Sequence, residues 1–239
     1  MKIVFFGAGN MASAIFTGMI EKGIVKPEDI YITSKSNRVA AMEFKEELGV
    51  RVSYDDAELC KDADYIILAS KPQNFNDVAK RLRPYLEKKT KLISVMAGIH
   101  ISTIQEETGM ENPVARIMPN TNAMVQYSVN GIAFSDDFKN RDELIELMAS
   151  FGKNVVVGEE GMDNITAATG SGPAFLYYIY EMYAKSLEEL GFSKEDADKL
   201  TRNLVIGTGK TLAERSESFE KLRTDITSKA GTTEAGLDT

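Results

Sequence analysis

Short apolar runs alternate with polar, helix-patterned segments along most of the chain. The run KIVFF (residues 2–6) is followed by apolar residues at helical spacing: Met11, Ile15, Met19 and Ile20. Later runs read as strands in DIYITS, RVSY, ADYIILAS, KLISVMAG, PVARIMP, NGIAFS and KNVVVG. Polar helical segments, such as 74–88 and 139–151, separate them. This alternation predicts an α/β fold with an N-terminal doubly wound, Rossmann-type sheet.

The alternation stops near residue 158, and the remaining chain reads as helix. A break at Gly170 to Gly172 precedes Pro173, a plausible helix start, and Ser193 is placed to cap the next long helix. In that helix Gly207 and Gly209 indicate close helix contacts. We therefore expect a dinucleotide-binding domain over 1–158 and an all-helical domain over 159–239. So small a helical core favours association with a second copy of the chain.

The first strand runs directly into the glycine-rich turn GAGNMA (residues 7–12). Gly7 permits the tight turn, Gly9 lets a diphosphate approach the backbone, and Ala12 permits close packing of helix on strand. Free N–H groups at the start of the helix then face the anion. An ordinary glycine turn in an α/β protein is the alternative. Its place after a strand and before a helix favours dinucleotide binding.

The second strand bears on the choice of dinucleotide. Its apolar run ends at Ile32, where NAD enzymes usually place an acidic residue for the ribose 2′-hydroxyl. The chain instead offers hydroxyls and cations that suit a 2′-phosphate: Thr33, Ser34, Lys35, Ser36 and Arg38. NADPH is favoured as the cofactor, with NADH as an alternative. A solvated loop with chance cations is the competing interpretation.

Three unusual turns follow predicted strands, at ASKPQ (69–73), MAGI (96–99) and MPNTN (118–122). Ligands of doubly wound sheets lie beyond the C-terminal ends of the strands, so these turns should line one crevice. Lys71 precedes Pro72, which holds the loop extended while the lysine reaches a cofactor or substrate. A surface lysine at a turn is an equally good interpretation.

Composition narrows the classes of function. The net charge of −8 argues against general affinity for nucleic acid or anionic membranes. No window approaches the roughly 18 uninterrupted apolar residues of a membrane span. The residues after Met1 lack the pattern of a secretion signal, so we expect a cytoplasmic protein. The single Cys60 excludes an internal disulfide, and the single His100 excludes the usual histidine-rich metal site.

The segments FFGAGNMASAI, KPQ, MPNT, TGSGPAF and DITSKAGTTEAGL, in this order over essentially the whole chain, resemble Δ1-pyrroline-5-carboxylate reductase. The resemblance implies hydride transfer from NAD(P)H to the C=N bond of pyrroline-5-carboxylate, which gives L-proline in the last step of proline biosynthesis. It further implies that the helical domain forms a homodimer, often within a larger ring of dimers.

Site residues follow from the same resemblance. Substrate contacts, with Thr233 also catalytic, would be Ser228, Gly231, Thr232 and Thr233, and a catalytic Glu159 would lie near the ring nitrogen. Asp225 would lie close to the cofactor. The other cofactor contacts would be Gly7, Ala8, Gly9, Asn10, Met11, Ala12, Ser34, Lys35, Asp56, Ser70, Lys71, Pro72, Ala97 and Gly98, to which the residue pattern adds Arg38.

A cyclic imine carries a proton on its own nitrogen, so its reduction needs no separate proton donor. The protein then mainly holds the nicotinamide against one face of the ring and excludes water. One histidine in the whole chain fits this chemistry, and we expect His100 to be structural.

Three features depart from the family pattern. Lys229 and Ala230 replace the proline and first glycine of the usual Ser-Pro-Gly-Gly loop. A positive φ at Ala230 would cost on the order of 1 kcal/mol or more, whereas Lys229 would add attraction for an anionic substrate. Asn122 stands where proline is common. Relatives also continue past the position of Thr239 through a further helix or two, which predicts a shortened protein.

These departures keep two other functions open. One is a reductase-like protein that binds nucleotide without turnover and serves in regulation. The other is an NADPH reductase of a different imine or keto acid.

Overall fold

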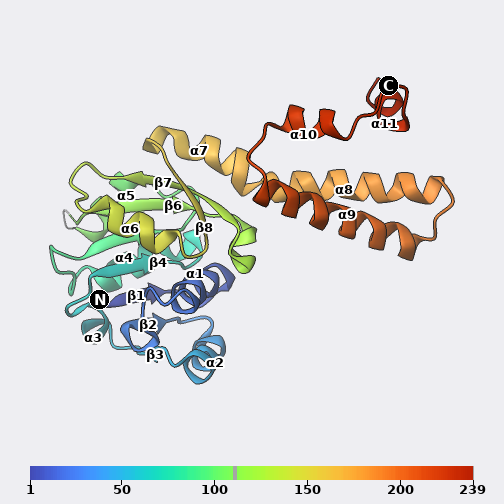
Figure 1. Cartoon of the computed structure of the whole chain (residues 1–239). Helices are drawn as coiled ribbons and strands as arrows, with labels where there is room; N and C mark the ends of the chain where they lie inside the picture. The colour runs from blue at the N-terminus through green and yellow to red at the C-terminus, as the bar shows by residue number, and fades with distance from the viewer. Residues whose placement is uncertain (110–111, 239) are drawn as a thin grey trace. The chain divides into compact units, whose positions relative to one another are not determined.

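The computed structural model describes residues 1–109 and 112–238. Contacts divide the chain into two compact units, Met1–Ala174 and Phe175–Thr239 (Figure 1). The predicted boundary at 158 is earlier than this division, because the segment from 159 to 174 belongs to the first unit. The boundary between functional domains therefore stays a prediction.

The first unit is built on an eight-stranded sheet with the order β3-β2-β1-β4-β5-β6-β7-β8. Its strands are β1 (Ile3–Phe6), β2 (Ile30–Thr33), β3 (Arg51–Val52), β4 (Tyr65–Leu68), β5 (Lys91–Ser94), β6 (Val114–Met118), β7 (Ser128–Phe134) and β8 (Gly152–Val156). Neighbouring strands are parallel except β6 and β7, which run antiparallel with Ile117 opposite Ile132. The predicted doubly wound sheet is confirmed.

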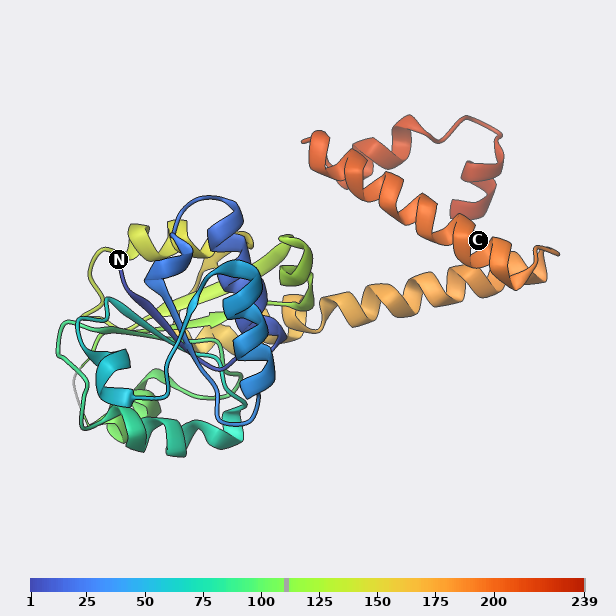
Figure 2. The same cartoon turned by 90° about the horizontal axis from the view of Figure 1, so that it is seen from below.

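Helices cover both faces of this sheet (Figures 1 and 2). One face packs against α1 (Asn10–Glu21), α2 (Arg38–Leu48) and α6 (Arg141–Met148), and the other against α3 (Asp56–Cys60), α4 (Phe75–Leu82) and α5 (Ile101–Thr108). Strand β1 shows why, since Ile3 and Phe5 enter one core while Val4 and Phe6 enter the other. The predicted helix 74–88 ends early, at Leu82, because Pro84 cannot continue it.

Short helical turns complete the first unit. They are η1 (Pro27–Asp29), η2 (Pro72–Asn74), η3 (Thr121–Val125) and η4 (Glu159–Gly161), followed by α7 (Met162–Ile165) and a π-helical turn η5 (Thr166–Gly170). The Asn120 side-chain amide donates to the Thr169 carbonyl at 3.1 Å. The loop after β6 is thereby fastened to the π-helical turn.

The second unit contains only helices: α8 (Gly172–Glu189), which begins in the first unit, α9 (Lys194–Glu214), α10 (Phe219–Asp225) and α11 (Thr232–Leu237). As predicted, Ser193 caps α9, accepting from Asp196 N–H at 3.1 Å. No helix among the described residues is long and apolar enough to span a membrane.

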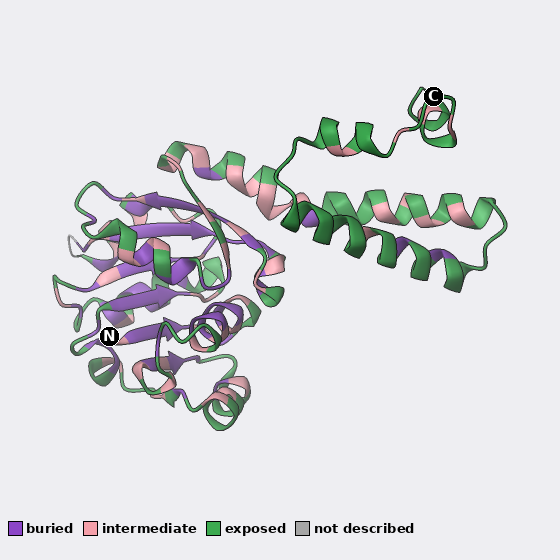
Figure 3. Cartoon of the chain, viewed as in Figure 1, coloured by how far each residue is buried: buried purple, intermediate pink, exposed green. Residues whose placement is uncertain are grey.

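Much of the apolar surface of α8 and α9 is uncovered within the described chain (Figure 3). Tyr178 is 63% exposed and Ile206 56%. The expected close helix contacts at Gly207 and Gly209 are absent within the described chain, since a Cβ built at either glycine has no neighbour within 4 Å. These small residues therefore leave room on the helix surface rather than serving an internal contact.

Candidate active site

The turn between β1 and α1 contains two glycines with different requirements. Gly7 has φ +141°, and a Cβ there would lie 2.4 Å from the Ala69 carbonyl oxygen, so the fold itself requires glycine. Gly9 has an ordinary extended conformation, with φ −93°, and a Cβ there would meet no atom within 4 Å. The open space above Gly9 fits a group that approaches the main chain closely, as a diphosphate does. Buried Ala12 packs in the core beneath the turn.

A hydrogen-bonded link joins this turn to the loop after β2. Asn37 donates through its side-chain amide to the Ala8 carbonyl at 2.9 Å, and its backbone N–H donates to Ser34 Oγ at 3.1 Å. Asn37 was not among the predicted site residues. Because its bonds connect the two loops, Asn37 fixes the spacing between the glycine turn and the predicted ribose-binding segment.

A cavity of about 480 Å³ opens beside the glycine turn, at the C-terminal ends of β1, β2 and β4. It brings together seven of the predicted cofactor residues: Gly7, Ala8, Gly9, Ser34, Lys35, Ser70 and Lys71. Helix α4 and the turn before it add residues that carried no recognisable motif: Asn74, Asp77, Val78 and Arg81. Lys35 and Lys71 in one cavity suit an anionic ligand.

The other predicted cofactor residues lie outside the described lining of this cavity. Asn10 and Met11 begin helix α1, and Pro72 begins η2. The guanidinium of Arg38 lies 4.5 Å from the centre of the Tyr54 ring. Ala97 and Gly98 follow β5, and Gly98 adopts φ +73° with open space where a Cβ would stand.

Asp56 is bound by Arg81, a side chain that no motif in the sequence indicated. Its two oxygens accept from Arg81 Nε at 2.8 Å and from Arg81 Nη2 at 2.5 Å. Arg81 itself lines the cavity. In this structure the carboxylate of Asp56 binds Arg81, and its contact with the cofactor stays a prediction.

Glu159 lies at the centre of a separate polar cluster in the first unit. Its Oε1 accepts from Ile101 N–H at 2.7 Å and from Nη1 of buried Arg116 at 2.8 Å, and His100 Nδ1 is 3.6 Å away. Burial opposes ionisation, but the hydrogen bond from Ile101 and the Arg116 charge outweigh it and hold the pKa of Glu159 below its ordinary value. Arg116 was not expected as a partner.

The predicted substrate loop lies in the second unit. Gly231 N–H donates to the Ser228 carbonyl at 3.0 Å, and Ala230 has φ +60°, a pattern typical of a type II turn. Ala230 therefore has the positive φ whose energetic cost is considered above, since the loop places this alanine in the left-handed region. The Ala230 N–H donates to Glu234 Oε2 at 2.5 Å. Thr232 and Thr233 open α11 immediately after the turn.

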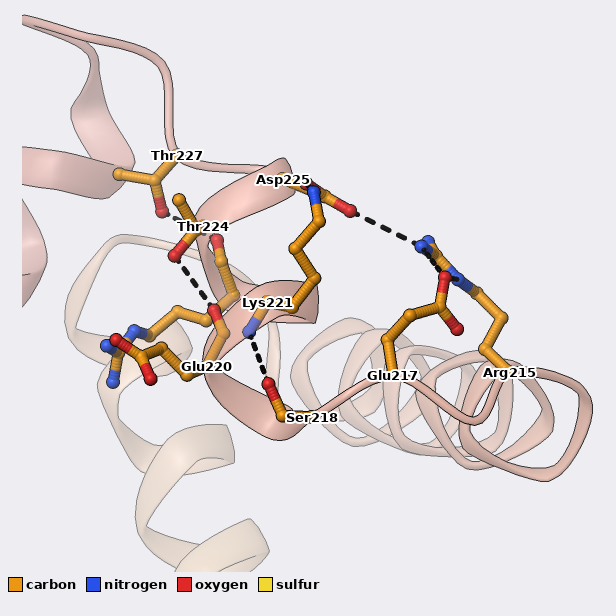
Figure 4. A network of polar contacts seen from close by, with 9 residues as sticks. Arg215, Glu217, Ser218, Glu220, Lys221, Thr224, Asp225 and Thr227 are labelled. Atoms are coloured by element: carbon orange, nitrogen blue, oxygen red, sulfur yellow. Dashed lines mark hydrogen bonds and ion pairs between the residues drawn. The ribbon is translucent and has the colours of Figure 1, made fainter.

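Asp225 belongs to an ion-pair network in the second unit (Figure 4). Its carboxylate pairs with Lys221 and lies 3.3 Å from Arg215 Nη2, while the same Nη2 contacts Glu217 at 2.6 Å. The hydrogen bond from Lys221 holds the pKa of Asp225 below its ordinary value. All these partners come from the second unit itself. The predicted residues thus fall into two sets, with most cofactor contacts and Glu159 in the first unit and the substrate contacts and Asp225 in the second.

The fold and the glycine turn define an α/β protein of the Rossmann type with an added helical unit. The family model "Pyrroline-5-carboxylate reductase dimerisation" matches residues 159–239, and "NADP oxidoreductase coenzyme F420-dependent" matches residues 2–98. The pyrroline-5-carboxylate reductases of Staphylococcus haemolyticus and Staphylococcus aureus are 51% and 52% identical over 240 and 241 residues, covering 100% of this chain and 89% of each relative. The chain belongs to the pyrroline-5-carboxylate reductase family.

Solved structures give the same result. A pyrroline-5-carboxylate reductase from Coxiella burnetii matches with a TM-score of 0.93 and 32% identity, over 99% of this chain and 88% of that one. The enzyme from Streptococcus pyogenes matches with a TM-score of 0.79 and 32% identity, over 99% of this chain and 89% of that one. The enzyme from Plasmodium falciparum, whose structure has NADP bound, matches with a TM-score of 0.80 and 27% identity, over 99% and 88%. These matches confirm the predicted family and fold class.

Proposed function

We propose that this protein uses NADPH to reduce the C=N bond of Δ1-pyrroline-5-carboxylate to L-proline, the last step of proline biosynthesis. The observation that carries the proposal is the turn at Gly7 and Gly9 beside the 480 Å³ cavity, in a chain about half identical to pyrroline-5-carboxylate reductases over its full length. NADH is the alternative electron donor.

The residues of the first unit fit a reduced dinucleotide. The main chain at Gly9 would approach the diphosphate, Ser34 and Lys35 would face the ribose with its 2′-phosphate, and Lys71 would contribute positive charge from the end of β4. The bound cofactor supplies the hydride that reduces the imine carbon.

The residues of the second unit would hold the substrate. Ser228, Gly231, Thr232 and Thr233 would surround its carboxylate, because a turn with several aligned donors forms an anion site without an arginine. Lys229 adds a positive charge beside this turn. In the structure the Ala230 N–H is bonded to Glu234 and the Gly231 N–H to the Ser228 carbonyl, so the donors left for the carboxylate are the hydroxyls and the amides of Thr232 and Thr233.

The proposed chemistry needs few protein groups at the reacting atoms. The ring nitrogen enters the reaction protonated and leaves as the amine of proline, so no side chain has to supply a proton. Glu159 stays a proposed catalytic residue near that nitrogen, where its negative charge would favour the protonated imine. Its bonds to Arg116 and Ile101 also support a structural role.

We further propose that the helical unit associates with a second copy, as a homodimer or within a larger ring of dimers. The dimerisation family model over 159–239 and the uncovered apolar side chains of α8 and α9 support this. Solution mass, measured by light scattering, tests the number of subunits.

We also propose that the reaction takes place in the cytoplasm, where the single free cysteine Cys60 needs no disulfide partner. Cell fractionation tests that location.

The decisive experiment adds pyrroline-5-carboxylate to the protein with NADPH and follows the loss of NADPH absorbance and the formation of proline. Oxidation with stoichiometric proline supports the proposal. Tight NADPH binding without oxidation by this substrate or its relatives would identify a regulatory nucleotide-binding protein instead. Oxidation only with another imine or a keto acid would identify a different reductase. The variant Gly9→Val supplies the control, because it fills the space required by the diphosphate while its backbone conformation stays allowed.

A further inference from the structure

One wall of the cofactor cavity contains an arginine whose charge is already compensated. The guanidinium of Arg81, on α4, is clamped edge-on by both oxygens of Asp56 at 2.8 and 2.5 Å. The two side chains are 17% and 19% exposed, so the pair is largely shielded from water. Such a bidentate pair fixes the plane of the guanidinium as well as its position.

The same guanidinium lies against an aromatic ring. Its Cζ is 5.4 Å from the centre of the Phe6 ring, and both Arg81 and Phe6 line the cavity. Val78, one turn before Arg81 on α4, adds an apolar side chain to this wall. The wall is therefore built from a ring, a flat cation and an aliphatic group, which is a surface for a planar ligand.

The compensated charge makes Arg81 a poor phosphate ligand. Asp56 lies directly behind it and would repel an added anion, whereas Lys35 and Lys71 line the cavity with no ion-pair partner among the described residues. A neutral aromatic base has no such conflict, because a guanidinium stacks on a ring face and keeps its in-plane hydrogen bonds.

The rest of the cavity assigns the base to this wall by elimination. The turn at Gly7 and Gly9 suits the diphosphate, and the segment from Thr33 to Asn37 follows β2, where the ribose is expected. The base is attached to that ribose, so it must lie beside this segment. The remaining lining comes from Phe6 and α4, from Asn74 and from the segment Ala69 to Lys71. Of these, only the wall of Phe6, Val78 and Arg81 offers a ring and a flat cation for a planar base.

We propose that Arg81 is the base-recognition residue of this cavity, stacking its guanidinium on the adenine ring of the dinucleotide, and that Asp56 is the positioning residue that holds it flat. The inference rests on the proposed function, since it names the residues that would recognise the adenosine half of the proposed cofactor.

Titrations of NADPH and of reduced nicotinamide mononucleotide, which lacks the adenosine half, test this inference. Arg81→Ala should weaken NADPH binding roughly tenfold, while binding of the mononucleotide stays unchanged. Arg81→Lys should not restore the loss, because an ammonium keeps the charge without the flat face. Lys80→Ala removes a charge from the exposed side of the same helix and should bind both ligands like the unaltered chain.

A double-mutant cycle separates positioning from general damage. Asp56→Ala should weaken NADPH binding by a similar factor, and the double variant should lose little more than Arg81→Ala alone. Independent, additive losses would overturn the positioning role of Asp56. Thermal unfolding of each variant shows whether the fold is retained, and direct titration of 2′,5′-ADP should show weaker binding to Arg81→Ala and Asp56→Ala but not to Lys80→Ala.

The outcomes distinguish this inference from the proposed function. An unaltered chain that binds no NADPH would overturn both together. NADPH binding by the unaltered chain with no loss in Arg81→Ala, or full rescue by Arg81→Lys, would overturn the stacking role alone. Equal losses for NADPH and the mononucleotide would also overturn it, because the effect would then not lie in the adenosine half.

Discussion

Glu159 Oε1 accepts a hydrogen bond from Nη1 of buried Arg116 at 2.8 Å, so a strand in the middle of the sheet is tied to the first turn after β8. The same oxygen accepts from Ile101 N–H at the start of α5. A single carboxylate therefore joins β6, α5 and η4. This arrangement also has a cost, because Glu159 is the one anionic partner of the buried Arg116 charge among the described residues.

Glu159→Gln should destabilise the fold by about 2 kcal/mol, since it leaves Arg116 with a neutral acceptor. Urea unfolding at neutral pH measures the loss. Turnover measured well below the unfolding temperature then separates this structural effect from the proposed catalytic role. Arg202→Ala is the matched control: it breaks an exposed pair within α9, and its effect should be under 1 kcal/mol. Equal stability of Glu159→Gln and the unaltered chain would contradict the structural role.

The lowered pKa of Glu159 also predicts a pH dependence. A carboxyl whose pKa is lower in the folded than in the unfolded state stabilises the fold above the unfolded value, and this contribution disappears as the pH falls through the folded value. The contribution should therefore be complete at neutral pH and decline below pH 4.5, the ordinary value for this group. Glu159→Gln should show a flatter loss of stability in this acid range. Parallel acid profiles for the two proteins would refute the assignment.

His100→Ala should leave turnover within a few fold of the unaltered protein. The imidazole is 59% exposed, and its described neighbours are the Arg116 guanidinium and the Glu159 carboxylate, which already bond each other. Steady-state oxidation of NADPH at saturating pyrroline-5-carboxylate is the measurement. A loss of a hundredfold or more would mean that the imine receives its proton from this histidine after all.

The sequence predicted the sheet well because burial on both faces leaves continuous apolar runs, as in β1 and β4. It also predicted the glycine turn, because Gly7 and Gly9 stand directly between a predicted strand and a predicted helix. Both features depend on residues close together in the chain. Local sequence patterns are sufficient to reveal such features.

Pairings across long sequence separations could not be predicted in the same way. Arg81 reads as one more charged residue on a polar helix until the fold places it 2.8 Å from Asp56. Arg116 lies in an apolar strand and shows its function only through Glu159, which follows two strands later. A buried charge within a strand is the one signal that could have indicated a partner, although not which one.

Changing Lys35 and Arg38 together to alanine should weaken NADPH binding by about 1–3 kcal/mol and barely affect NADH. The structure predicts how the loss is divided: Lys35 lines the cavity, whereas Arg38 packs on Tyr54, so Lys35→Ala should account for the larger share. Fluorescence titration with each coenzyme gives the affinities. Lys26→Ala, outside the cavity, is the control. Equal losses of affinity for both coenzymes would show that these cations do not bind the 2′-phosphate.

Thr233→Ala should raise the Michaelis constant for pyrroline-5-carboxylate about fivefold, the equivalent of one hydrogen bond of roughly 1 kcal/mol, with little change in the constant for NADPH. The side chain lies in the first turn of α11, directly after the Ser228–Gly231 turn. Initial rates with each substrate varied in turn provide both constants. Thr233→Ser keeps the hydroxyl and should behave like the unaltered enzyme. An unchanged Michaelis constant for pyrroline-5-carboxylate in the alanine variant would show that the substrate carboxylate binds elsewhere.

Ala230→Gly should stabilise the protein, although most changes to glycine do the opposite. Ala230 has φ +60°, where its Cβ is crowded by the backbone and glycine is not, so the substitution removes strain of about 1 kcal/mol. The greater flexibility of glycine in the unfolded chain subtracts part of this gain. Ala184→Gly, in the middle of α8, should destabilise by about 0.5–1 kcal/mol, because no strain is relieved there. Thermal unfolding of the two variants should therefore shift in opposite directions, and a shift to lower temperature in both would show that the turn at Ala230 is unstrained in solution.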